Sequence, residues 1–71
     1  MKSIIKIYNM ESHRDSNIIQ ETVSQNSGVI ASEISLAKKE FVVIYNEAFL
    51  SIQEIIDSIE DLGYVVAESK S

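Results

Sequence analysis

Residues 51–66 read SIQEIIDSIEDLGYVV and contain the clearest helix pattern of the chain, followed directly by a strand pattern. Apolar residues recur every three or four positions, which predicts an amphipathic helix over residues 51–62. Ser51 and Glu54 have the spacing of a capping box, in which each side chain accepts from a free amide at the helix start. Gly63 is expected to end the helix, and the β-branched run YVVAE that follows predicts a short strand. The apolar stripe of the helix consists of Ile52, Ile55, Ile56, Ile59 and Leu62.

The residues before this stretch contain an earlier strand and helix of the same kind. Residues 3–8 alternate as a half-buried strand does, and residues 15–26 carry a second helical stripe, which we expect Gly28 to end. Residues 29–36 and 41–45 predict two more strands, joined by the polar turn AKKE. Inward-facing residues are expected to be Ile18, Ile19 and Val23 in the helix, and Ile30 or Ala31, Ile34 and Leu36 in the second strand.

The order of elements is therefore strand, helix, strand, strand, helix, strand. The two halves echo each other, because IYN occurs at residues 7–9 and again at 44–46, each time ahead of a helix. This order predicts a ferredoxin-like α+β sandwich, in which a four-stranded antiparallel sheet carries both helices on one face. We expect one domain over residues 1–71, with a core of about 3–67 and a short, frayed C-terminal tail.

Composition excludes several functional classes. The chain has no Cys, which rules out disulfides and thiolate metal sites. Its net charge of −5 and six scattered basic residues argue against binding of nucleic acid. No run approaches the ~20 apolar residues that span a bilayer, and Lys6 and Glu11 interrupt any signal-peptide core. We expect a cytoplasmic protein without membrane insertion.

The loop before the first helix resembles a known motif. Residues 9–15 read NMESHRD, and heavy-metal-associated (HMA) domains have G-M-x-C-x-x-C at this place. SGVIASEISL is similar to the family's G-V-x-x-x-x-V stretch, and IDSIEDLGYVV to its I-x-x-a-I-E-D-x-G-Y-x-V ending. The likeness covers roughly residues 3–67. The family includes bacterial copper chaperones and N-terminal modules of copper- and zinc-transporting ATPases, so the resemblance implies binding and transfer of copper(I).

The metal-binding residues of that motif are missing. Ser12 and Asp15 stand where the family has its two Cys, and Asn9 replaces the usual Gly, while Met10 is retained. Copper(I) is a soft ion that thiolates hold, and a hydroxyl or carboxylate does not replace them. We therefore expect a degenerate HMA domain that is not a copper(I) chaperone. Its predicted role is a protein-interaction or regulatory accessory related to metal transport, with a metal-transporter domain as the candidate partner.

Two hypotheses explain the residues that remain in this loop. In the first, Ser12 caps the helix and Asp15 completes a capping box, while Met10 fills the core. In the second, Glu11, His13 and Asp15 form a weak site for Zn²⁺ or Ni²⁺. Three ligands from one loop bind weakly without supporting contacts, and the chain has no second His. We expect no other cofactor.

Surface residues suggest where a partner would bind. Arg14 and Tyr64 are the candidate interaction residues, since the resemblance places Tyr64 beside the first loop, where it would pack on Met10. The acidic stripe of the last helix is expected to be its solvated face, with docking of a basic partner as the alternative. That stripe consists of Glu54, Asp57 and Asp61.

Two further predictions concern catalysis and self-association. No nucleophile, base pair or cofactor motif accompanies Arg14, so we expect no enzyme. Self-association through an exposed edge strand is an open alternative for the partner.

Overall fold

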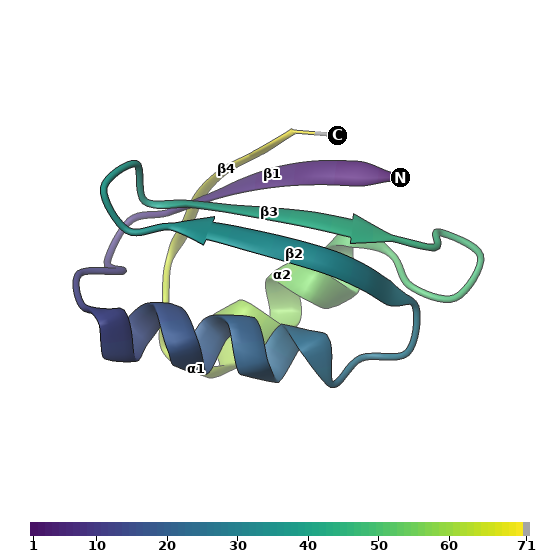
Figure 1. Cartoon of the computed structure of the whole chain (residues 1–71), viewed down its shortest axis with the longest axis horizontal. Helices are drawn as coiled ribbons and strands as arrows, with labels where there is room; N and C mark the ends of the chain where they lie inside the picture. Colours follow the sequence, from purple (N-terminus) through teal and green to yellow (C-terminus); the bar gives the residue numbers. More distant parts are fainter. Residues whose placement is uncertain (71) are drawn as a thin grey trace.

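The computed structural model describes residues 1–70 and has the predicted order of elements. The elements are β1 (Lys2–Ile7), α1 (His13–Ser24), β2 (Val29–Ser35), β3 (Glu40–Tyr45), α2 (Ile52–Asp61) and β4 (Val66–Lys70). The sheet order is β2-β3-β1-β4 with antiparallel pairing throughout. Both helices lie on one face of the sheet (Figure 1). The predicted ferredoxin-like α+β fold is therefore confirmed.

The core lies between the sheet and the two helices. Alternate residues of β1 and β3 point inward, as strand geometry requires, and meet the apolar stripes of the helices. Ile19 and Val23 of the predicted α1 stripe are fully buried, and so are Ile55 and Ile59 of α2. The complete buried set is Ile5, Ile7, Met10, Ile19, Val23, Phe41, Val43, Tyr45, Leu50, Ile55 and Ile59.

The prediction for the start of β2 is wrong. The pairing of β2 with β3 shifts register between Val29 and Ala31, so two residues of β2 occupy the space of one there. Val29 packs on the core, whereas Ile30 is 69% exposed and Ala31 is also exposed. After the bulge the expected alternation holds, because Ile34 and the following Leu36 pack on the core.

The ends of two elements also differ from expectation. Helix α1 ends at Ser24, before the position predicted, and Gly28 lies in the next turn with a φ of 102°. A Cβ at Gly28 would lie 3.2 Å from the Cβ atoms of Leu50 and Phe49. This turn therefore favours glycine both for its positive φ and for the close approach of these two residues. Strand β4 continues through Lys70, where a frayed tail was expected; Ser71 lies outside the described residues.

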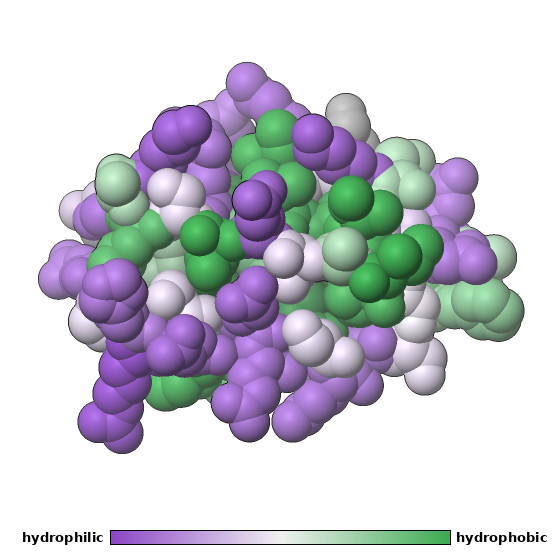
Figure 2. Space-filling view, in the orientation of Figure 1, coloured by the Kyte–Doolittle hydropathy of each residue, from purple (hydrophilic) through white to green (hydrophobic). Residues whose placement is uncertain are grey.

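Apolar side chains also reach the surface. On the side of the molecule drawn in Figure 2, hydrophobic patches lie between hydrophilic ones. Within residues 1–70, no helix has the length and apolar character needed to cross a membrane. The large apolar side chains that are most exposed are Met1, Tyr8, Ile30, Ile44, Phe49, Leu62 and Val65.

Candidate functional site

The start of α1 is closed by a complete capping box. Ser12 has extended backbone angles, and its Oγ accepts from the amide of Asp15 at 3.1 Å. In return, Oδ2 of Asp15 accepts from the amides of Ser12, at 3.2 Å, and Glu11, at 3.0 Å. The pair therefore satisfies amides that a helix start leaves free, and the carboxylate also lies in the favourable field of the helix N-terminus. The first hypothesis for this loop is confirmed as a description of its geometry.

A second loop reaches over this cap. The hydroxyl of Tyr64, between α2 and β4, donates to Oδ1 of Asp15 at 2.5 Å. The Tyr64 ring is half-buried and packs against the core to which Met10 belongs. A direct contact between Tyr64 and Met10 stays a prediction. Both carboxylate oxygens of Asp15 are thus engaged within the chain. A hydrogen bond to an ionised carboxylate is stronger than a hydrogen bond between two neutral groups.

Asn9 ties the same two loops together. Its Oδ1 accepts from the amide of Val65 at 2.8 Å, and its Nδ2 donates to the carbonyl of Gly63 at 3.3 Å. The amide of Tyr8 donates to the carbonyl of Val65 at 2.8 Å. Sequence reasoning noted Asn9 only as a departure from glycine. An Asn side chain can donate and accept at once, so it can join two separate backbone segments by hydrogen bonds, and this property was the sequence signal that pointed to such a role.

These contacts set the protonation states of the Asp15–Tyr64 pair. The Tyr64 hydroxyl, followed by the amide of Glu11, lowers the pKa of Asp15 below its ordinary value of 3.8. The Asp15 carboxylate in turn raises the pKa of Tyr64 above its ordinary 10.0. Near neutral pH, Asp15 is therefore ionised and Tyr64 protonated, which matches an acceptor with a donor.

Met10 belongs to the core and not to an exposed site. Its side chain is fully buried among the residues between the sheet and the helices. The chain's other methionine, Met1, has its amino group hydrogen-bonded to the carbonyl of Tyr45. The thioether of Met10 therefore has a packing role, in agreement with the sequence prediction.

The residues of the hard-metal hypothesis lie together along the chain but form no cluster. Glu11 and His13 are exposed, and Asp15 is engaged as described. Among residues 1–70, no group of three or more His, Asp or Glu side chains is arranged to hold a metal ion. Arg14 is exposed in the first turn of α1, close enough to Tyr64 to act on its pKa. Binding of Zn²⁺ or Ni²⁺ at this loop stays a prediction.

The sequence has clear relatives among copper-handling proteins. No protein-family model matches the chain. The copper chaperone CopZ of Staphylococcus haemolyticus (strain JCSC1435) is 27% identical over 66 residues, which are 93% of this chain and 97% of CopZ. The copper-transporting ATPase 2 of Mus musculus is 35% identical over 49 residues, which are 69% of this chain and 3% of the ATPase.

Solved structures have the same fold. A CopZ metallochaperone superimposes with a TM-score of 0.91 at 21% identity, covering 94% of this chain and all of the other. A copper binding domain from HMA7, a P-type ATPase, gives 0.86 at 18% identity and covers all of this chain. This chain is a homologue of HMA-domain copper chaperones. It differs from the HMA motif at the one place where that motif carries thiolates, since no Cys is present.

The donor set at this place does not suit copper(I). Ser12 supplies a hydroxyl, Asp15 a carboxylate and His13 an imidazole, whereas copper(I) prefers thiolate and thioether sulfur. The thioether of Met10 is buried, and the Asp15 carboxylate is hydrogen-bonded through both oxygens. The cap thus holds the loop in place by bonds that need no metal ion.

Proposed function

We propose that this chain is a non-enzymatic HMA domain that binds a metal-transport protein without exchanging copper(I) with it. It would act as an accessory or regulator that occupies the partner's docking surface. The observation that carries this proposal is the Asp15 carboxylate, which accepts from the Tyr64 hydroxyl and from the amides of Glu11 and Ser12. The loop is thereby closed by the chain's own groups.

The hydrogen bonds that close this loop support a docking role. Ligand exchange between two copper(I) sites requires free sulfur ligands, which this loop lacks. A loop that is already ordered loses little conformational entropy when a partner binds it. The hydrogen bonds of Asn9 to Gly63 and Val65 order both loops at this end.

Exposed side chains at this end offer a contact surface. Tyr8 is 70% exposed and Val65 is 53% exposed, and their backbones are joined by a hydrogen bond. Arg14 adds an exposed cation near Tyr64. Aromatic and Arg side chains are the residues that most often dominate binding energy at protein interfaces. The homology to copper chaperones and to a copper-transporting ATPase makes a soluble transporter domain the proposed partner.

The proposal is tested by titrating the ¹⁵N-labelled chain with the soluble metal-binding domain of a copper-transporting ATPase from the same organism. We expect saturable shifts of the amides of Tyr8, Arg14 and Val65 that persist in the presence of a copper(I) chelator. Tyr8→Ala should weaken binding about tenfold or more. Phe49→Ala is the matched control, since Phe49 is 71% exposed and belongs to the loop before α2.

Three results would contradict the proposal. The first is the absence of shifts at millimolar partner. The second is binding that the chelator abolishes. The third is an equal effect of Tyr8→Ala and Phe49→Ala, because binding would then not be localised to the loop end that contains the cap.

A further inference from the structure

Within residues 1–70, no helix or loop covers the face of the sheet opposite the helices (Figure 1). The strand registers place its outward side chains in three rows across the sheet, of which the first runs from β2 to β1 and the other two run from β2 to β4. The middle row has charges of opposite sign at its two ends and apolar residues between them. The rows are Ala31, Ile44 and Lys2; then Glu33, Val42, Ile4 and Lys70; then Ser35, Glu40, Lys6 and Glu68.

The centre of this open face is apolar and shallowly hollowed. Ile4 and Val42 are half-buried neighbours, and Ile44 beside them is 40% exposed. One hollow of about 210 Å³ lies along β2 and β3 beside Val42 and Ile44, and another of about 110 Å³ lies along β1 and β4 beside Ile4. A facing surface with side chains at the same spacing could fill both.

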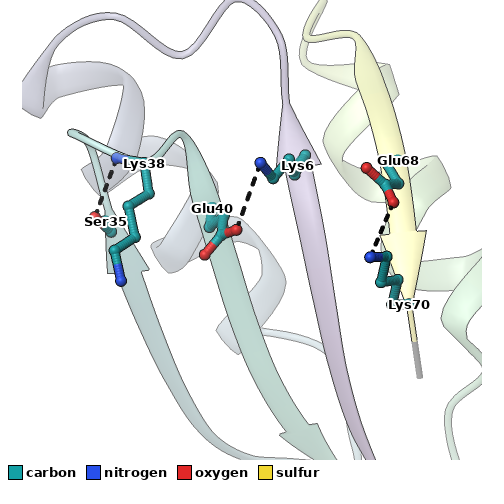
Figure 3. Close-up of polar contacts among 6 residues, drawn as sticks. All are labelled: Lys6, Ser35, Lys38, Glu40, Glu68 and Lys70. Carbon is teal, nitrogen blue, oxygen red and sulfur yellow. Dashed lines mark hydrogen bonds and ion pairs between the residues drawn. The ribbon is translucent and has the colours of Figure 1, made fainter.

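The open face is electrically neutral although the chain is acidic. Its three rows contain three Lys and three Glu residues, so the net charge of −5 arises from residues elsewhere in the chain. Figure 3 shows four of these side chains in two ion pairs, with Lys6 Nζ 3.7 Å from Glu40 and Lys70 Nζ 3.3 Å from Glu68. Two copies can therefore approach through this face with little of the repulsion that their net charge would cause elsewhere.

The rows are complementary to themselves under one two-fold rotation. If the axis runs along the strands, between β1 and β3, then β2 of one copy faces β4 of the other, and β3 faces β1. Glu33 then faces Lys70 of the second copy, and Glu40 faces the second copy's Lys6. Val42 meets Ile4 between these pairs. Every charged pair occurs twice, as in any isologous interface.

The other two-fold rotation in the plane of the sheet, with its axis across the strands, is unfavourable. It would place Glu33 opposite Glu33 of the second copy, and Lys70 opposite Lys70. Like charges that face each other across an interface cost several kcal/mol. The charge pattern therefore selects the axis along the strands.

We infer that two copies of this chain associate face to face through the open sheet, with the two-fold axis along the strands. Packed sheets keep their strands aligned to within about 30°, which this axis permits. Four strands at ~4.8 Å spacing and about five residues at ~3.3 Å give a contact of roughly 20 by 17 Å. Over both copies this is roughly 700 Å², below the ~1,200–2,000 Å² of stable specific interfaces and in the range of weak, transient ones, so the dimer is expected to form at high micromolar to millimolar concentration.

Sedimentation equilibrium of the full chain, from micromolar to millimolar concentration, tests this inference. Glu33→Lys and Lys70→Glu should each weaken dimerisation about tenfold or more, because each reverses two symmetry-related pairs. The double variant Glu33→Lys/Lys70→Glu should restore it, since the pairs are attractive again. Val42→Lys should abolish the dimer by placing charges at its apolar centre.

Glu21→Lys is the matched control, because it makes the same change of charge on the exposed side of α1. It should leave the dimer intact. The inference is overturned if the native chain stays monomeric at millimolar concentration, if Glu21→Lys weakens the dimer as Glu33→Lys does, or if the double variant fails to recover. The circular dichroism spectrum of each variant confirms that its fold is unchanged. The result does not depend on the proposed docking function, which concerns the loop end of the molecule.

Discussion

The two helix starts of this molecule use the same sequence device with different results. Ser12 and Asp15 begin α1, and Ser51 and Glu54 begin α2, each pair at the spacing of a capping box. In both, the Ser Oγ accepts from the amide three residues on. Only Asp15 completes the box by accepting from its Ser amide, whereas the carboxylate of Glu54 accepts from the Ser51 hydroxyl at 3.3 Å. The sequence prediction of a full box at α2 is corrected in this respect.

The loops ahead of the helices differ in the same way. Asn9 bonds to Gly63 and Val65, more than fifty positions along the chain, whereas Oδ1 of Asn46 accepts from the nearby amide of Ala48 at 3.0 Å. The first loop is therefore tied to a distant loop and the second is closed locally. The distant ties occur where HMA relatives have the thiolate motif, which suggests that protein contacts now hold that place together.

The largest expected effect on stability concerns the residues that follow Asn9 and Asn46, which are Met10 and Glu47. Met10 is fully buried while Glu47 is exposed. Met10→Ala should lower the free energy of unfolding by about 2–5 kcal/mol, because it leaves a cavity in the core. Glu47→Ala should change it by less than about 0.5 kcal/mol. Urea denaturation measures both, and similar costs would remove the distinction between the two loops.

The next effect concerns the carboxylates of the two caps. Asp15→Asn should destabilise more than Glu54→Gln, because Asp15 accepts from three donors. Tyr64→Phe should be strongly non-additive with Asp15→Asn in a double-mutant cycle, since either change removes the same bond. The control cycle is Gln53→Ala with Asp57→Asn, an exposed pair at helical spacing whose coupling should be at most about 0.5 kcal/mol. Equal coupling in the two cycles would refute the special role of Tyr64.

The two Ser caps should cost the same. Ser12→Ala and Ser51→Ala each remove one bond to a helix amide, worth about 1 kcal/mol. For a chain of this size that corresponds to a fall of about 4–8 °C in melting temperature. Scanning calorimetry would sharpen the comparison. Equal falls in melting temperature would mean that the two helix starts differ through Asp15 and not through the Ser residues. A much larger fall for Ser12→Ala would mean that they differ through the Ser12 hydroxyl.

The smallest effect is the acid dependence of stability. The pKa of Asp15 is lowered in the folded chain, so its contribution is fully present above its unfolded value of about 3.8 and is lost as pH falls through the lower folded value. Tyr64→Phe removes the main cause, so the folded pKa should rise towards 3.8 and the acid-side loss should shrink. Titration of the Asp15 carboxyl carbon by NMR measures this. Gln53→Ala should leave the titration unchanged, and an unchanged value in Tyr64→Phe would contradict the assignment.

Local sequence signals predicted much of this molecule and failed where distant contacts decide. The Ser12 cap and the apolar stripe of α2 follow from spacing alone, because their partners lie within one or two helical turns. The bond between Tyr64 and Asp15 joins residues 49 positions apart, so local signals did not predict it, and the resemblance placed Tyr64 beside the loop with Met10 as its expected contact. The bulge at Ile30 was missed because β2 has apolar residues on both faces at its start, which leaves the alternation ambiguous.

Copper(I) capture is the most direct test of the central proposal, that this homologue of copper chaperones holds its first loop with its own groups and does not exchange copper(I). The native chain and the variant Ser12→Cys/Asp15→Cys are compared in competition with a chromophoric copper(I) chelator under reducing conditions. We predict that the variant withdraws one equivalent of copper(I) from the chelator and that the native chain withdraws none. Withdrawal of copper(I) by the native chain at a level similar to the variant would contradict the account.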